Sequence, residues 1–172
     1  GYRCNQSCFH CHVNAGPNRH EEMSAEVADV VLDFIARRQI GTLDITGGAP
    51  ELNANFRRLV REARRLGVKV MDRCNLTILS EPSEQDLAEF LAANRVEVVA
   101  SMPCYLQDNV ERQRGKGVFG ASIRGRKTLN VLGDGSDPAL TLNLVYNPQG
   151  PALPPRQGSL EADYKRVRGG QY

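Results

Sequence analysis

The sequence lacks the features that would direct it to a membrane or a nucleic acid. No apolar run approaches the ~20 residues needed to cross a bilayer, and no charged start followed by an apolar segment marks a secretory signal. The 172 residues carry a formal net charge of only +2, which is too small to indicate a nucleic acid or an anionic membrane as a partner. With 41% hydrophobic and 24% charged residues, the composition predicts one globular domain with a genuine core.

Cysteines are also few, and their number is odd. The chain has five, and without a secretory signal an odd count is typical of a reducing compartment with free or metal-bound thiols. We therefore expect a cytoplasmic protein. Three of the five, Cys4, Cys8 and Cys11, fall within one short stretch, CNQSCFHCHV.

The C-x3-C-x2-C spacing predicts a loop that points three thiolates at one locus. A structural zinc site would need a fourth ligand. His10, His12 or His20 could supply it, although His10 lies between two cysteines and His20 lies beyond a proline turn. Three thiolates suit a cubane iron–sulfur cluster whose fourth iron stays open to another ligand. The spacing therefore favours a [4Fe–4S] cluster, and a non-catalytic zinc or iron–sulfur module remains the alternative.

Hydrophobic periodicity predicts strands that alternate with helices. The expected strands are 41–46, 68–73, 96–102 and 140–147. Helices are expected over 24–38 with Ser24 as N-cap, from Phe56 to Gly67, from Ser83 onward, over 118–132, and from Ser159 onward. In the first helix an apolar stripe is predicted to face the core: Val27, Val30, Val31, Phe34 and Ile35.

This alternation predicts an α/β fold with a parallel sheet, a partial TIM-type (β/α)6 barrel. In such barrels the chemistry lies in the loops after the carboxyl ends of the strands. The segments expected there, besides the cysteine loop, are 46–51, 73–77, 101–105 and 147–150. Together with that loop they hold all five cysteines, so we expect them to face one cavity. The stretch DNVERQRGKGVF, with Arg112, Arg114 and Lys116, is expected to precede the fourth helix as a loop without an assigned role.

Several stretches form a combination more specific than the cysteine spacing alone: CNQSCFHCHVNAGP, TLDITGGAPELN, DRCNLTIL, VEVVASMPCYL, RGKGVF and LTLNLVYNPQGPALPP. Together they resemble the arsenosugar-biosynthesis branch of the radical S-adenosylmethionine (SAM) superfamily. Members of that branch have a strand before the cysteine loop and a C-terminal domain. The resemblance therefore implies that residues 1–172 are a radical SAM core domain, incomplete at both ends.

The resemblance also implies cofactors, partners and a reaction. Cys4, Cys8 and Cys11 would ligate a [4Fe–4S] cluster whose open iron binds SAM. Reduced ferredoxin or flavodoxin would donate the electron that cleaves SAM, and the 5′-deoxyadenosyl radical would join a methylated trivalent arsenical. A radical SAM enzyme that modifies another substrate, such as a peptide, is the second alternative.

Further SAM contacts follow from the same resemblance. The family motif has Glu directly after two glycines, whereas here Ala49 and Pro50 precede Glu51. His10 would lie near the adenine, Ser101 would contact the ribose, and Asn143 or Asn147 the ribose or the carboxylate. The methionine amino group would be received by the segment that contains Gly47, Gly48 and Glu51.

Cys74 and Cys104 directly follow two predicted strands, so we expect both thiols to point into the cavity. Trivalent arsenic is thiophilic, like the metals that select thiolate ligands. We hypothesise that these two cysteines receive the arsenical substrate. Packing as small hydrophobic residues, or a redox role, is the alternative.

Overall fold

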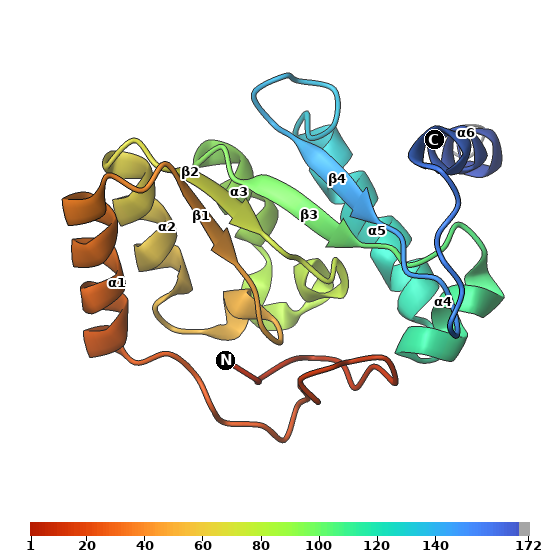
Figure 1. Ribbon diagram of the computed structural model, residues 1–172, viewed down its shortest axis with the longest axis horizontal. Coiled ribbons are helices and arrows are strands. Elements are labelled where there is room, and N and C mark those ends of the chain that lie inside the picture. The colour runs from red at the N-terminus through yellow and green to blue at the C-terminus, as the bar shows by residue number, and fades with distance from the viewer. Residues whose placement is uncertain (169–172) are drawn as a thin grey trace.

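The computed structural model describes residues 1–168, which form a parallel sheet with helices packed against it (Figure 1). The strands pair in the order in which they follow one another along the chain. They are β1 (Thr42–Ile45), β2 (Lys69–Asp72), β3 (Glu97–Ser101) and β4 (Leu142–Val145). The α-helices are α1 (Ala25–Arg38), α2 (Phe56–Arg65), α3 (Leu87–Ala93), α4 (Gln107–Arg114), α5 (Val118–Val131) and α6 (Gln157–Arg168). Short 3₁₀ helices are η1 (Pro50–Leu52), η2 (Thr77–Ser80) and η3 (Pro82–Glu84). The α/β class and all four predicted strands are confirmed.

The two faces of the sheet differ in polarity. Because side chains alternate along a strand, Val70 and Asp72 of β2 point into the helix layer, where both are fully buried. The neighbouring Lys69 points to the opposite face, where it forms an ion pair with Glu97 of β3. The helix-covered face therefore holds the core, and the opposite face is polar.

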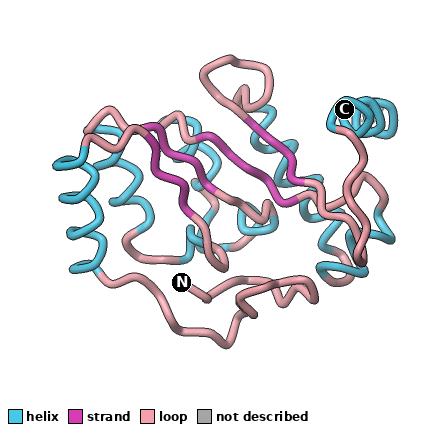
Figure 2. Tube along the Cα trace, in the orientation of Figure 1, coloured by secondary structure: helices cyan, strands magenta, loops and turns pink. Residues whose placement is uncertain are grey.

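The N-terminal segment, residues 1–24, has no helix or strand and runs beneath the carboxyl ends of the strands (Figure 2). One isolated bridge joins Arg3 to Gly16. The first two residues approach the turn after β1, where the Gly48 N–H donates to the Gly1 carbonyl at 2.9 Å. The cysteine loop is thereby placed at the edge where parallel-sheet enzymes carry their chemistry.

The predicted apolar stripe of α1 faces the core only in part. Ile35 is buried, but Val27, Val30 and Phe34 are 50%, 67% and 54% exposed. The prediction is wrong for these three residues because α1 packs through the edge that contains Ala28 and Ile35. By contrast, the apolar residues predicted for the second helix are all buried, namely Phe56, Leu59, Val60 and Ala63.

Two other elements differ from the expectation. The third helix begins at Leu87 rather than at Ser83, because Pro82 opens a separate 3₁₀ turn, η3. Part of the expected cationic loop is instead the helix α4, which ends at Arg114 and is capped by Gly115 with φ 108°. Its Gln, Glu and Arg residues have high helix propensity, and the glycine accepts the left-handed conformation.

Helix α5 packs closely on η2 through Gly125. A Cβ atom at this position would collide with the backbone carbonyl of Leu76, whereas at Gly120 of the same helix it would meet only the Nη1 atom of Arg124, at 3.7 Å. The packing of these two elements therefore depends on the missing side chain of Gly125.

We expect Gly125→Ala to lower the free energy of unfolding by about 1–3 kcal/mol, because backbone atoms must shift to admit the methyl group. Gly120→Ala is the matched control and should be neutral or stabilising by up to ~1 kcal/mol, since alanine has the higher helix propensity. Urea denaturation measures both. Equal stabilities of the two variants would contradict the close packing.

Candidate functional site

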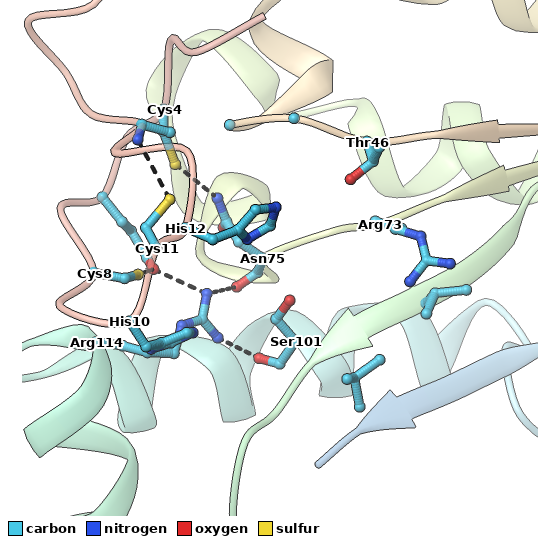
Figure 3. A pocket seen from close by; sticks show the side chains of 16 residues that line it. Cys4, Cys8, His10, Cys11, His12, Thr46, Arg73, Asn75, Ser101 and Arg114 are labelled. Carbon is cyan, nitrogen blue, oxygen red and sulfur yellow. Dashed lines mark hydrogen bonds between the residues drawn. The ribbon is translucent and has the colours of Figure 1, made fainter. Parts of the chain in front are cut away.

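A pocket lies at the carboxyl ends of the strands, between the cysteine loop and the sheet (Figure 3). In this view the three cysteines lie on one side, while Thr46, Arg73 and Ser101 lie across from them. The lining includes seven of the residues predicted for the site: Cys4, Cys8, His10, Cys11, Gly47, Gly48 and Ser101. The structure therefore brings together residues from the cysteine loop, from the turn after β1 and from the end of β3.

Side-chain hydrogen bonds hold the cysteine loop in place. Asn5 donates to Glu81 Oε1 at 2.9 Å, and Gln6 donates to Thr77 Oγ1 at 2.5 Å. The Asn75 amide donates in turn to Asn5 Oδ1 at 2.8 Å. Because the loop has no secondary structure of its own, these bonds to the segment around η2 determine its orientation.

The three thiols are free, with Cys4 buried and the other two half-buried. Burial raises the pKa of the Cys4 thiol. Nitrogen donors lie close to the sulfurs: Ala15 N is 3.3 Å from Cys11 Sγ, and Asn75 Nδ2 is 3.7 Å from Cys4 Sγ. Three thiols on one wall of a pocket are the donor set that a three-cysteine iron–sulfur cluster requires, so these residues fit the group.

His10 is anchored away from the thiols. Its Nδ1 atom lies 3.2 Å from the Gln113 carbonyl of α4. Burial lowers the pKa of the imidazole, so the ring is predominantly neutral near pH 7. A neutral ring fixed to α4 could stack against a planar ligand, so the adenine contact of His10 stays a prediction.

Arg114 is a residue of this pocket that the sequence-based interpretation left without a role. It is 4% exposed and lies at the end of α4. One guanidinium nitrogen donates to Gln6 Oε1 at 2.9 Å and to the Asn75 carbonyl at 3.1 Å, and the other donates to the Ser101 carbonyl. The sequence signal for Arg114 is its helical spacing from Val110. If residues 107–114 form a helix, Arg114 lies on the same face as the buried Val110, four residues earlier.

The guanidinium of Arg114 also has an electrostatic effect on the pocket. Within residues 1–168 it forms no ion pair with a carboxylate. Its positive charge therefore acts on the pocket itself, where it contributes to the lowered pKa of His10 and favours an anionic ligand such as the cluster.

The glycines of TGGAPE line the pocket, but they have another neighbour. A Cβ atom at Gly48 would collide with the Arg3 carbonyl, and one at Gly47, where φ is 148°, would lie 2.6 Å from the Gly1 carbonyl. Because Gly47 and Gly48 have no side chains, the backbone of residues 1–3 can pack directly against this turn. We expected these glycines to admit a ligand, and the structure shows in addition that they fit the N-terminal segment.

Four predicted site residues do not line the pocket: Glu51, Cys74, Cys104 and Asn143. Cys74 and Cys104 are 0% and 3% exposed, so the expectation that both thiols point into this cavity does not hold. The alternation of side chains in β2 continues past the end of the strand and explains the burial of Cys74. Arg73 points to the pocket, so its neighbours Asp72 and Cys74 point into the helix layer. Asn143 instead donates to Glu97 Oε1 at 2.7 Å on the polar face of the sheet.

Residues 1–129 match the family model described as the radical SAM superfamily. The chain belongs to the radical SAM superfamily. Members of this superfamily use a [4Fe–4S] cluster and SAM, and these are the cofactors of this chain. Radical SAM domains are partial TIM barrels, in agreement with the parallel sheet described above.

Curated relatives share this region of the chain. This chain is 28% identical over 134 residues to the mycofactocin maturase MftC of Mycolicibacterium smegmatis. The match covers 77% of this chain and 33% of that protein. It is 26% identical over 125 residues to the Fe-coproporphyrin III synthase of Methanosarcina barkeri, covering 72% and 30%. A probable GTP 3′,8-cyclase of Sulfurisphaera tokodaii is 32% identical over 66 residues, covering 38% and 21%.

The matched region is thus about a third or less of the length of these relatives. Among the helices described within residues 1–168, none is long and apolar enough to cross a membrane.

We expect Arg114→Lys to loosen the cysteine loop, because an ammonium cannot reproduce the fork that reaches Gln6, Asn75 and Ser101 at once. Loss of these buried bonds should lower the free energy of unfolding by about 1–3 kcal/mol. Amide hydrogen exchange of residues 4–13 should also become faster. Arg112→Lys, at an exposed position of the same helix, is the control and should change neither quantity. Unchanged exchange of the loop in Arg114→Lys would show that Arg114 does not hold it.

Proposed function

We propose that this chain is the radical SAM core of an enzyme, in which Cys4, Cys8 and Cys11 ligate the [4Fe–4S] cluster. The observation that carries this proposal is the convergence of the three thiols on one wall of a pocket at the carboxyl ends of the strands. Their environment supports ligation, since nearby N–H donors and the Arg114 charge stabilise sulfur anions. Residues 1–172 then belong to the radical SAM core domain.

The remaining pocket residues bind and orient SAM. His10, fixed by α4, stacks beside the adenine, and Ser101 at the end of β3 contacts the ribose. The turn of Gly47 and Gly48 receives the methionine part. When bound, the cluster supplies the electron that cleaves SAM, and reduced ferredoxin or flavodoxin is the donor that restores it. The role predicted for Asn143 has no support from the pocket, since this side chain is bound to Glu97.

A methylated trivalent arsenical is the substrate that we propose, and the product is a 5′-deoxyadenosyl arsenical. Methionine would leave SAM, C5′ would bond to arsenic, and the arsenic-centred radical would lose one electron to the oxidised cluster, which leaves pentavalent arsenic. The support is the sequence resemblance, which includes the cysteines after β2 and β3. The three relatives are named for three different activities, so superfamily membership alone leaves the substrate open. Cys104 is the thiol that we assign to the arsenical. It is 3% exposed, so arsenic reaches it only when the segment 102–106 opens.

Cluster ligation can be tested by anaerobic reconstitution with iron and sulfide. We expect a brown protein whose reduced form has an electron paramagnetic resonance signal that changes when SAM is added. Cys8→Ala should lose most of the bound iron, because a cluster held by two thiolates is labile. Cys104→Ser is the control and should retain iron and the SAM-dependent signal. A colourless protein that binds zinc and ignores SAM would favour the non-catalytic alternative.

The substrate can be tested separately with dimethylated arsenite and SAM under reducing conditions. We expect mass spectrometry to detect a 5′-deoxyadenosyl arsenical. Cys104→Ser should lower its yield tenfold or more while SAM cleavage continues, because only the arsenic-binding thiol has been removed. SAM cleavage without an arsenical adduct in the wild-type protein would instead favour another substrate, such as a peptide.

A further inference from the structure

Three acidic side chains meet beneath the pocket, in the layer between the sheet and the helices. Glu51 belongs to η1, Asp72 ends β2, and Cys74 follows two residues later. One ligand atom from each lies within 4.8 Å of the other two. Glu51 is 4% exposed, and Asp72 and Cys74 are fully buried.

The two carboxyl groups lack the partners that buried acids require. Among residues 1–168, none of their four oxygens has a hydrogen-bond partner, and neither group forms an ion pair with a lysine or arginine. The Cys74 sulfur accepts the Leu76 N–H at 3.3 Å. Burial of unpaired carboxylates is strongly unfavourable, so this group must be neutralised by protons or by a cation.

Burial raises the pKa of Glu51, Asp72 and Cys74, and the neighbouring carboxylates raise those of Asp72 and Cys74 further. These directions show that each negative charge is disfavoured when the site contains only protein atoms. A bound cation would reverse this effect, since it favours the charged form of every ligand.

We propose that Glu51, Asp72 and Cys74 bind a divalent cation, with zinc as the first choice. Because the three ligand atoms lie within 4.8 Å of one another, a point lies within about 2.8 Å of all three, and contractions of up to about 0.5–0.8 Å reach zinc–sulfur and zinc–oxygen distances of ~2.3 and ~2.0 Å. Two carboxylates and one thiolate combine hard and soft donors, which suits a borderline ion such as Zn²⁺ better than Ca²⁺ or Mg²⁺. Three protein ligands leave one position for water or a backbone carbonyl.

This site is separate from the cluster site, because none of its three residues lines the pocket. Its role is structural and electrostatic: the ion joins the turn after β1 to the end of β2. The site goes beyond the proposed function, and it replaces the SAM-binding and substrate roles predicted for Glu51 and Cys74.

The test is metal analysis of the full chain, first as reconstituted protein and then as a Cys4→Ala, Cys8→Ala, Cys11→Ala triple variant that cannot hold the cluster. After incubation with zinc and gel filtration, we expect one zinc per chain in both. In the triple-variant background, Asp72→Asn and Glu51→Gln should each weaken zinc binding tenfold or more. Asp134→Asn is the matched control, because Asp134 is also buried and its oxygens also lack a hydrogen-bond partner within the described residues. It should leave zinc binding unchanged.

Cobalt provides a second readout that does not depend on stability. The cobalt-loaded triple variant should show a thiolate-to-cobalt charge-transfer band, and the band should be absent when Cys74→Ser is added. A folded triple variant without bound zinc, as judged by circular dichroism, would overturn the proposal and indicate that the carboxyl groups share a proton. Zinc retained equally by Asp72→Asn and Cys74→Ser would overturn it as well. Neither readout uses SAM or substrate, so failure of the proposed function is detected separately.

Discussion

The architecture of the pocket depends on the hydrogen bonds that attach an irregular loop to the end of a sheet. Residues 1–24 contain no helix or strand (Figure 2), so only a few turns and the bridge between Arg3 and Gly16 order this segment from within. Arg114 replaces that missing structure, because one guanidinium joins the loop residue Gln6 to the backbone after β2 and at the end of β3 (Figure 3). The donor geometry of arginine makes this possible, since its planar fork can satisfy three fixed acceptors at once.

Alternation along the strands then decides which side chains share the pocket with the thiols. Ser101 and Arg73 point to the polar face of the sheet and reach the pocket. Asp72 lies next to Arg73 in sequence but points into the helix layer, where it meets Glu51. One strand thus contributes to two chemically different sites, one open to ligands and one enclosed. The separation of these sites follows from backbone geometry alone.

Much of the fold could be predicted from the sequence, because local periodicity determines strands and helices whose neighbours are close in the chain. The four strands, the core face of α2 and the Ser24 cap of α1, which accepts the Val27 N–H at 3.4 Å, all follow from such patterns. The buried face of α1 could not be predicted in this way. The apolar pattern shows which residues of the helix are hydrophobic, but it does not show which neighbouring element covers them. Val30 is 67% exposed for this reason.

For the candidate site, too, some residues could be predicted from the sequence and others could not. The cysteine spacing predicted a shared locus, and the position of Ser101 after a strand predicted its place in the pocket. Arg114 was missed because its role depends on acceptors up to 108 residues away in the chain. Cys74 was placed in the wrong layer because nearness to a strand end indicates the edge of the sheet but leaves the face undetermined.

Two ionisable groups near the cluster ligands, Arg114 and Glu51, have opposite electrostatic effects. Arg114 brings a buried positive charge to the cysteine loop, where it favours an anionic cluster. Glu51 brings a potential negative charge beneath Cys4, and it has the opposite effect. A divalent cation bound at Glu51, Asp72 and Cys74 would hold all three ligands in their anionic forms, so the site would keep a net charge of about −1 near the cluster ligands. The enclosed site would then tune the ease with which the neighbouring cluster accepts an electron, because a cluster's potential depends on the charges buried around it.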